Sequence, residues 1–268
     1  MSTSTLQDVV GDLADGSTIY LGNFGAQLFA VGHELIRQAK RGLHVIAPSG
    51  GILVDELVAA GVSSAITVSH CWNPIGPAGT PNFRKGVESG SLELRELSFG
   101  SLCSALAAAA AGFAFMPTTD LTRTGYVTEA RAQGMLHQLQ TPFGDQLVVR
   151  ALAPDVAFLH VDRASPAGWA WVEQPHADLL VAAQASRRTV VVAEEMCDEP
   201  DGSARTAELP SLHVFAVVHC PGAVIPDGAA GRYERSIELY RAYVSAGPDP
   251  VGLERWRDAV QQEVAARG

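Results

Sequence analysis

The first 70 residues alternate short apolar runs with helical segments, and this alternation limits the possible folds more than any other feature. Three runs have the length of buried strands, namely Thr18–Leu21, His44–Ala47 and Ala65–Ser69. Between them, Leu28–Lys40 and Ile52–Ala60 repeat apolar residues near the 3.6-residue period of a helix. Strands that alternate with helices in this way pair in parallel, with helices on both faces of the sheet. The pattern therefore predicts an α/β fold with a mostly parallel sheet, whose ligands bind beyond the carboxyl ends of the strands.

The rest of the chain continues the same alternation. Further strands are predicted at Leu92–Leu97, Val156–Val161, Thr189–Ala193 and Val214–Val218, and further helices at Asn82–Glu88, Ser101–Ala111, His176–Arg187, Tyr233–Ser245 and Val251–Ala265. Leu136–Gln140 and Gln146–Leu152 flank a Pro-Phe-Gly-Asp turn and predict a hairpin, which would make the sheet mixed at this point. Neither a Ser/Gly/Pro linker nor a charge block divides the chain, so a single domain over residues 1–268 is expected, with C-terminal helices at about 233–265.

Composition argues against several classes of partner. The 19 basic and 29 acidic residues give a net charge of −10, and they form no basic cluster of the kind that nucleic acid requires. The first residues lack the positive and apolar regions of a secretory signal, and the longest apolar stretch, Leu102–Met116, is too short to span a bilayer. A cytoplasmic protein without a nucleic-acid or membrane partner is expected. The four cysteines form no CxxC pair, which indicates reduced thiols.

The turn Gly22-Asn23-Phe24-Gly25 lies between a strand and a helix, where glycine-rich loops often bind phosphate. The dinucleotide fingerprint GxGxxG would need glycines at positions 24 and 27, and GxxxxGK[ST] is also missing, so a nucleotide is disfavoured. A purely structural turn is the alternative. Two His-Cys pairs, His70-Cys71 and His219-Cys220, each end a strand, but adjacent strand residues point to opposite faces. No metal site is predicted.

Carboxylates at strand ends are the other candidates for chemistry. Strand parity places Glu96 on the same face as the apolar Leu94, so its carboxylate must be paired, protonated or directed into a cleft. Glu194 and Glu195 follow a valine-rich strand and are divided between its two faces. A solvated strand end is the simpler interpretation of that pair, with one of the two left as a candidate for the cleft or a partner surface.

Asp162, Arg163 and Trp169 follow the central apolar strand. An exposed loop is expected there, although the position is also one where an α/β protein forms a ligand site.

Taken in order, these segments resemble the A subunit of the family I coenzyme A-transferases, in particular the glutaconate CoA-transferase type and the related steroid ring-opening CoA hydrolases. The resemblance covers about residues 5 to 200 and rests on Ile19–Gly25, Ser49-Gly50-Gly51, Phe83–Gly90, Leu94-Arg95-Glu96, Gly112–Thr118, Pro154–Val161, Ala164, Gly168 and Val192–Glu195. It implies a fold of the NagB/RpiA/CoA-transferase type and a partner B subunit.

The resemblance also implies a chemistry. In these transferases the acyl-CoA thioester is attacked by a glutamate of the B subunit, and coenzyme A is a substrate rather than a permanent cofactor. The A subunit contributes loops to a shared cleft, and backbone N–H groups of glycine loops stabilise the developing oxyanion. The implied cleft residues are Gly22, Asn23, Phe24, Gly25, Gly50 and Gly51, with Glu96 as a supporting carboxylate.

Three positions depart from the family pattern. Phe99 stands where the A subunit of the ring-opening hydrolases carries its own glutamate, Thr119 replaces the arginine of a Pro-Thr-Arg sequence, and Trp169 replaces an asparagine, which places a large ring near the cleft. The Gly-Ser/Thr-Asp that follows in the family is missing around residues 120–125. Transfer of CoA between an acyl-CoA and a carboxylic acid is the preferred function. The alternatives are a subunit of a CoA-thioester hydrolase or lyase, or a non-catalytic scaffold subunit.

Overall fold

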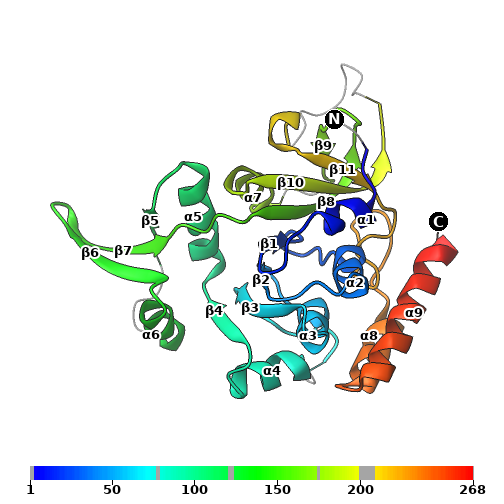
Figure 1. The fold of residues 1–268 in the computed structure, drawn as a ribbon. Coiled ribbons are helices and arrows are strands. Elements are labelled where there is room, and N and C mark those ends of the chain that lie inside the picture. Colours follow the sequence, from blue (N-terminus) through cyan, green and yellow to red (C-terminus); the bar gives the residue numbers. More distant parts are fainter. Residues whose placement is uncertain (1–2, 77–78, 120–123, 174–175, 199–208, 268) are drawn as a thin grey trace.

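The computed structural model describes residues 3–76, 79–119, 124–173, 176–198 and 209–267. Its main sheet has the strand order β11-β10-β8-β1-β2-β3-β4, with every neighbouring pair parallel, and β9 adds to β8 in the antiparallel direction. The strands are β1 (Thr18–Leu21), β2 (Leu43–Ile46), β3 (Ser63–Val68), β4 (Glu93–Glu96), β8 (Val156–Ala164), β9 (Ala170–Trp171), β10 (Arg188–Met196) and β11 (Ala216–His219). The predicted mostly parallel α/β sheet is confirmed, and Figure 1 shows its strands through the middle of the molecule.

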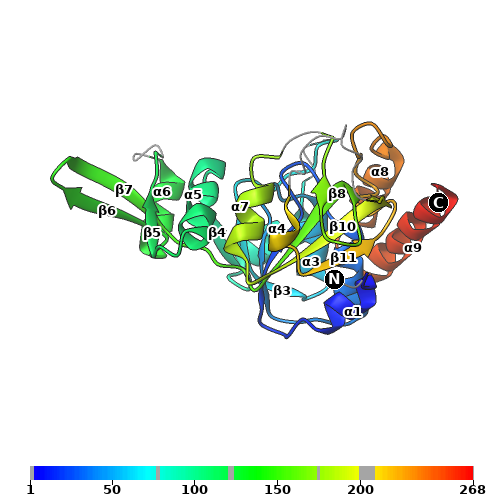
Figure 2. The same ribbon diagram turned by 90° about the horizontal axis from the view of Figure 1, so that it is seen from above.

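Helices cover both faces of this sheet (Figures 1 and 2). They are α1 (Leu6–Gly11), α2 (Phe29–Arg37), α3 (Ile52–Ala59), α4 (Pro81–Glu88), α5 (Phe99–Ala110), α6 (Gly125–Ala132), α7 (Leu179–Ala185), α8 (Ile237–Ala246) and α9 (Pro250–Arg267). Alternate residues of β8 enter two different cores. Phe158 belongs to the core that holds residues of α1, α2, α3, α8 and α9, while Leu159 belongs to the core that holds residues of α5, α6 and α7. This period of two in a strand buried on both faces explains the continuous apolar run of the sequence.

The predicted hairpin forms, but it does not join the main sheet. β6 (Leu136–Thr141) and β7 (Gly144–Arg150) pair with β5 (Phe115–Pro117) in a separate antiparallel sheet of order β5-β7-β6. With α6 this sheet makes an arm that projects from the body of the molecule, as Figure 2 shows. The expectation of a mixed sheet at this point is therefore wrong, because the hairpin finds its third partner in β5.

The C-terminal helices pack against α2 and α3. The hydroxyl of Tyr243 donates to the fully buried Asp55 at 2.6 Å, and the Trp256 indole donates to the Leu239 carbonyl at 2.7 Å. α8 begins four residues later than its expected start, because the Ser236 hydroxyl accepts from the Leu239 N–H and caps the helix. None of the described helices has the length and hydropathy needed to cross a membrane.

Candidate functional site

The turn at Gly22–Gly25 is tight and depends on two glycines. Ala26 donates its N–H to the Asn23 carbonyl at 3.0 Å, which closes the turn. Gly22 and Gly25 have φ angles of +80° and +90°, a region that residues with a side chain rarely enter. A Cβ atom on Gly22 would lie only 2.3 Å from the carbonyl oxygen of Ala26. The glycine at position 22 is therefore required by both conformation and space.

A Gly22→Ala substitution is expected to destabilise the protein by roughly 3 kcal/mol or more, because positive φ strain adds to a clash with backbone. The matched control is Gly61→Ala, since Gly61 also has a positive φ of +68° but has no atom within 4 Å of its Cβ position. Urea unfolding followed by circular dichroism compares the two. A loss for Gly22→Ala no larger than the loss for Gly61→Ala would show that the close contact at Ala26 is without consequence.

Side chains from distant segments hold this turn in place. The buried Asn23 donates from Nδ2 to the carbonyl of His160 at 2.7 Å. The N–H of Phe24 donates to Asp178 Oδ2 at 2.8 Å, and the carbonyl of Phe24 accepts from His176 Nδ1 at 3.1 Å. The turn is thus tied to β8 and to the segment that enters α7.

The Phe24 ring meets residues from two other loops at the carboxyl end of the sheet, and a third loop joins through His70. Its centroid lies 4.6 Å from that of Phe99 at the start of α5 and 5.9 Å from that of His70 after β3. His70 Nε2 lies 2.9 Å from the Ser49 hydroxyl, and the His70 carbonyl accepts from the Gly50 N–H at 2.8 Å. The expected loops after β1, β2 and β4 therefore come together, and His70 joins them although the sequence singled it out only as part of a metal-like pair.

Two predicted site residues lie apart from this aromatic cluster. Glu96 ends β4 with an exposed side chain, and no described residue forms a hydrogen bond or ion pair with it. Trp169 lies in the turn between β8 and β9, where its N–H donates to the Ser165 hydroxyl at 3.3 Å. No ring contact joins Trp169 to the described aromatic residues, so its effect on a cleft stays a prediction. Residues 120–123, where the family sequence is interrupted, lie outside the described residues.

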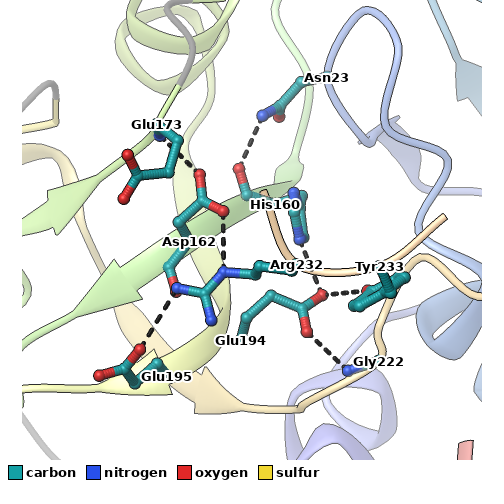
Figure 3. A network of polar contacts seen from close by, with 9 residues as sticks. All are labelled: Asn23, His160, Asp162, Glu173, Glu194, Glu195, Gly222, Arg232 and Tyr233. Atoms are coloured by element: carbon teal, nitrogen blue, oxygen red, sulfur yellow. Dashed lines mark hydrogen bonds and ion pairs between the residues drawn. The ribbon is translucent and has the colours of Figure 1, made fainter. Parts of the chain in front are cut away.

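A second polar cluster, drawn in Figure 3, is buried where β8 and β10 end. Glu194 accepts from His160 Nε2 at 2.9 Å, from the Tyr233 hydroxyl at 2.6 Å and from the Gly222 N–H at 2.6 Å. Burial alone would raise the pKa of Glu194, but these three donors outweigh it and lower the pKa below its usual value. Burial and the Glu194 carboxylate raise the pKa of Tyr233 well above its usual value. Glu194 is therefore an ionised carboxylate that fastens β8, β10 and two C-terminal loops together.

Next to Glu194, Arg232 joins two further carboxylates. Its Nε donates to Asp162 Oδ1 at 3.0 Å and its terminal nitrogen lies 3.4 Å from Glu195 Oε2 (Figure 3). Asp162 also accepts from the Glu173 N–H at 2.7 Å and is buried, so the expectation of an exposed loop at Asp162 is wrong.

The interpretation of Glu194 as a solvated strand end is also wrong, because its side chain is only 3% exposed. Strand parity divides Glu194 from the exposed Glu195 as predicted. The same parity puts Glu194 in line with Val190 and Val192 on a core face, which was the available signal that it is buried.

The cysteines do not offer a thiolate nucleophile. All four are free, as the sequence predicts. Burial raises the pKa of Cys71 to about 12 and that of Cys220 to about 11, so both thiols stay protonated near neutral pH. Within the described part of the chain, no three His, Cys, Asp or Glu side chains gather as a metal ion would require.

Comparison with known sequences identifies relatives over nearly the whole chain. The A subunit of 3-oxoadipate CoA-transferase from Pseudomonas knackmussii is 30% identical and aligns with 90% of this chain and 84% of its own length. The A subunit of glutaconate CoA-transferase from Acidaminococcus fermentans is 25% identical over 89% of this chain and 81% of its own. The IpdA subunit of the cholesterol ring-cleaving hydrolase from Rhodococcus jostii is 27% identical over 94% and 89%.

Solved structures agree with these relatives. A chain of the decarboxylase AibA/AibB superposes with a TM-score of 0.85 at 27% identity, covering 97% of this chain and all of that one. Glutaconate coenzyme A-transferase from Acidaminococcus fermentans superposes with a TM-score of 0.84 at 22% identity, covering 97% of this chain and 88% of that one, and shows that the fold is shared. The family model described as coenzyme A transferase matches residues 3–219. The chain belongs to the coenzyme A transferase family.

Proposed function

We propose that this chain is the A subunit of a two-chain enzyme that moves coenzyme A from an acyl-CoA to a carboxylic acid. The contact of Phe24 with Phe99 at 4.6 Å carries the proposal, since Phe99 stands where the ring-opening hydrolases are expected to have a glutamate. A phenyl ring neither attacks a thioester nor transfers a proton. The nucleophile is therefore assigned to a partner B subunit, in agreement with relatives that are named as A subunits.

The proposed reaction needs one carboxylate nucleophile and donors for an oxyanion. The partner's glutamate attacks the thioester carbonyl carbon, the C–S bond breaks, and CoA leaves as a thiolate, which gives an acyl-glutamyl anhydride. The thiolate then attacks the glutamyl carbonyl of the anhydride, so that the acyl group leaves as a carboxylate and a glutamyl-CoA thioester remains. A second carboxylate reverses these steps. Because the anhydride keeps the acyl group activated, the transfer needs no outside source of energy. No atom changes its oxidation state, so no oxidant or reductant is consumed.

We assign the turn Gly22–Gly25, together with Gly50 and Gly51, to this chain's side of the substrate cleft. The rings of Phe24 and Phe99 make part of that side apolar, which lowers the local dielectric constant and strengthens hydrogen bonds to a developing charge. Glu96, exposed at the end of β4, is given a supporting role in substrate binding and no covalent role.

Co-expression with a chain of the B type tests the proposal. The purified pair is incubated with acetyl-CoA or succinyl-CoA as donor and with 3-oxoadipate or glutaconate as acceptor, and all acyl-CoA species are followed by liquid chromatography. We expect a new acyl-CoA to appear while total thioester stays constant, and the isolated chain to show no exchange. Net loss of thioester would instead support the hydrolase alternative, which the relationship to the cholesterol ring-cleaving hydrolase favours. If the pair shows neither CoA exchange nor loss of thioester, the scaffold alternative is supported.

A further inference from the structure

The peptide groups on both sides of Phe24 are held by the segment that leads into α7. Asp178 is fully buried, and its Oδ2 accepts from the Phe24 N–H at 2.8 Å and from the Tyr20 hydroxyl at 2.5 Å. Its second oxygen is also buried and finds no partner among the described residues. Burying a carboxylate costs free energy that packing does not return. Asp178 is thus better explained as a fixed hydrogen-bond acceptor for the turn than as a residue that only packs in the core.

His176 fixes the next peptide group. Its Nδ1 lies 3.1 Å from the Phe24 carbonyl, and a ring nitrogen that meets a carbonyl oxygen must be the donor. The Phe24 carbonyl and the Gly25 N–H belong to one trans peptide, in which the two bonds point in opposite directions. The hydrogen bond from His176 therefore sets the direction of the Gly25 N–H, which points away from His176.

The Gly25 N–H is a donor of this turn that no described residue uses. Gly22 donates to the Phe158 carbonyl at 2.9 Å, Phe24 donates to Asp178, and Ala26 donates to the Asn23 carbonyl. No described residue accepts from the N–H of Gly25. Gly25 itself is exposed, and no atom beyond its chain neighbours lies within 4 Å of its Cβ position. A substrate oxygen can therefore reach this donor.

We propose that His176 and Asp178 are positioning residues that lock the Gly22–Gly25 turn and aim the Gly25 N–H at the thioester carbonyl oxygen. This inference rests on the proposed function and deepens it. A preorganised N–H donor stabilises the oxyanion more than the ground-state carbonyl, so it acts on kcat. His176 does not touch the substrate; it orients the peptide group that does.

Kinetics of His176 variants in the co-expressed pair test the inference. His176→Ala is expected to lower kcat by roughly 10- to 100-fold, because the Gly25 N–H is no longer held in line with the thioester carbonyl oxygen. KM for the acyl-CoA should change less than about threefold, and His176→Gln should restore part of kcat, since its amide can donate to the Phe24 carbonyl. The control is His213→Ala, which changes a histidine of the 3-10 helix Ser211–His213 and should keep the wild-type kcat.

A second measurement does not depend on turnover. Hydrogen exchange of the complex, read by mass spectrometry on peptides that cover the turn, should show faster exchange at Phe24 in Asp178→Ala than in Asp178→Asn, which keeps an acceptor. A wild-type kcat in His176→Ala, or unchanged exchange in Asp178→Ala, would overturn the inference. If the wild-type pair transfers no CoA but the hydrogen-exchange difference is found, the proposed function is wrong while the positioning of the turn by Asp178 is still supported. If Asp178→Ala does not fold, the His176 pair of variants decides.

Discussion

Replacing Glu194 with alanine is expected to destabilise the protein by about 3–5 kcal/mol, the usual cost of removing one partner from a buried charged cluster. The substitution leaves three donors without an acceptor, namely the His160 ring, the Tyr233 hydroxyl and the Gly222 N–H. All three lie at the carboxyl ends of the central strands or in the C-terminal loops that pack there (Figure 3). Urea unfolding should therefore show a lower midpoint, with the C-terminal helices losing protection first in hydrogen exchange.

Glu195→Ala is the matched control, because Glu195 is adjacent in sequence but largely exposed, and among the described residues its side chain forms an ion pair only with Arg232, at 3.4 Å. Its effect should stay within about 0.5–1 kcal/mol. Equal losses for the two variants would mean that the cluster around Glu194 does not hold the strands together.

The pH dependence of stability follows from the same cluster. The folded-state pKa of Glu194 is lowered, although burial alone would raise it, so the unfolded chain takes up a proton at a higher pH than the folded chain. The stabilisation from Glu194 is therefore present above the unfolded pKa near 4.5 and is lost as pH falls through the folded value. Glu194→Gln should flatten the loss of stability below about pH 5 relative to the wild type.

A Glu→Gln change of the partner's glutamate nucleophile is expected to abolish CoA transfer. The transfer rate should fall roughly 10⁴-fold or more, as it does when a covalent nucleophile is deleted. The same Glu→Gln change at Glu96 of this chain should cost less than about tenfold, since Glu96 is exposed and has no described partner that would activate it. The comparison uses the co-expressed pair, with succinyl-CoA consumption as the readout. A loss at Glu96 as large as the loss at the partner's glutamate would place the nucleophile on this chain instead.

Much of the fold could be predicted from local pattern. Most of the parallel strands have an apolar run bounded by turn residues, and β8 and β10 show the largely apolar sequence of strands buried on both faces. β4, with the sequence Glu-Leu-Arg-Glu, is the exception. The hairpin β6–β7 was also visible, because its turn and its alternation are local signals. Its separation from the main sheet was not, since that depends on pairing of Val149 with Met116, more than thirty residues away. Pairings of this kind leave no trace in any short window of sequence.

In the candidate site, too, local features could be predicted from the sequence and long-range contacts could not. The glycine turn after β1 and the Gly50-Gly51 loop were found from spacing and from an ordered resemblance. The packing of Phe24 on Phe99, the hydrogen bond that its N–H donates to Asp178, and the one that its carbonyl accepts from His176 join segments 75 to 154 residues apart. Asp178 had no sequence signal of its own, because it lies within a segment expected to be ordinary helix.

The most direct test of the account is to trap the covalent intermediate. The co-expressed pair is incubated with succinyl-CoA without an acceptor, treated with borohydride or hydroxylamine, digested, and mapped by mass spectrometry. A glutamyl-CoA thioester is expected on the partner, so reduction or hydroxamate formation should mark one glutamate of that chain and leave all peptides of this chain unmodified. A mark on a carboxylate of this chain, or CoA transfer without any trapped glutamate, would contradict the assignment of the nucleophile to the partner.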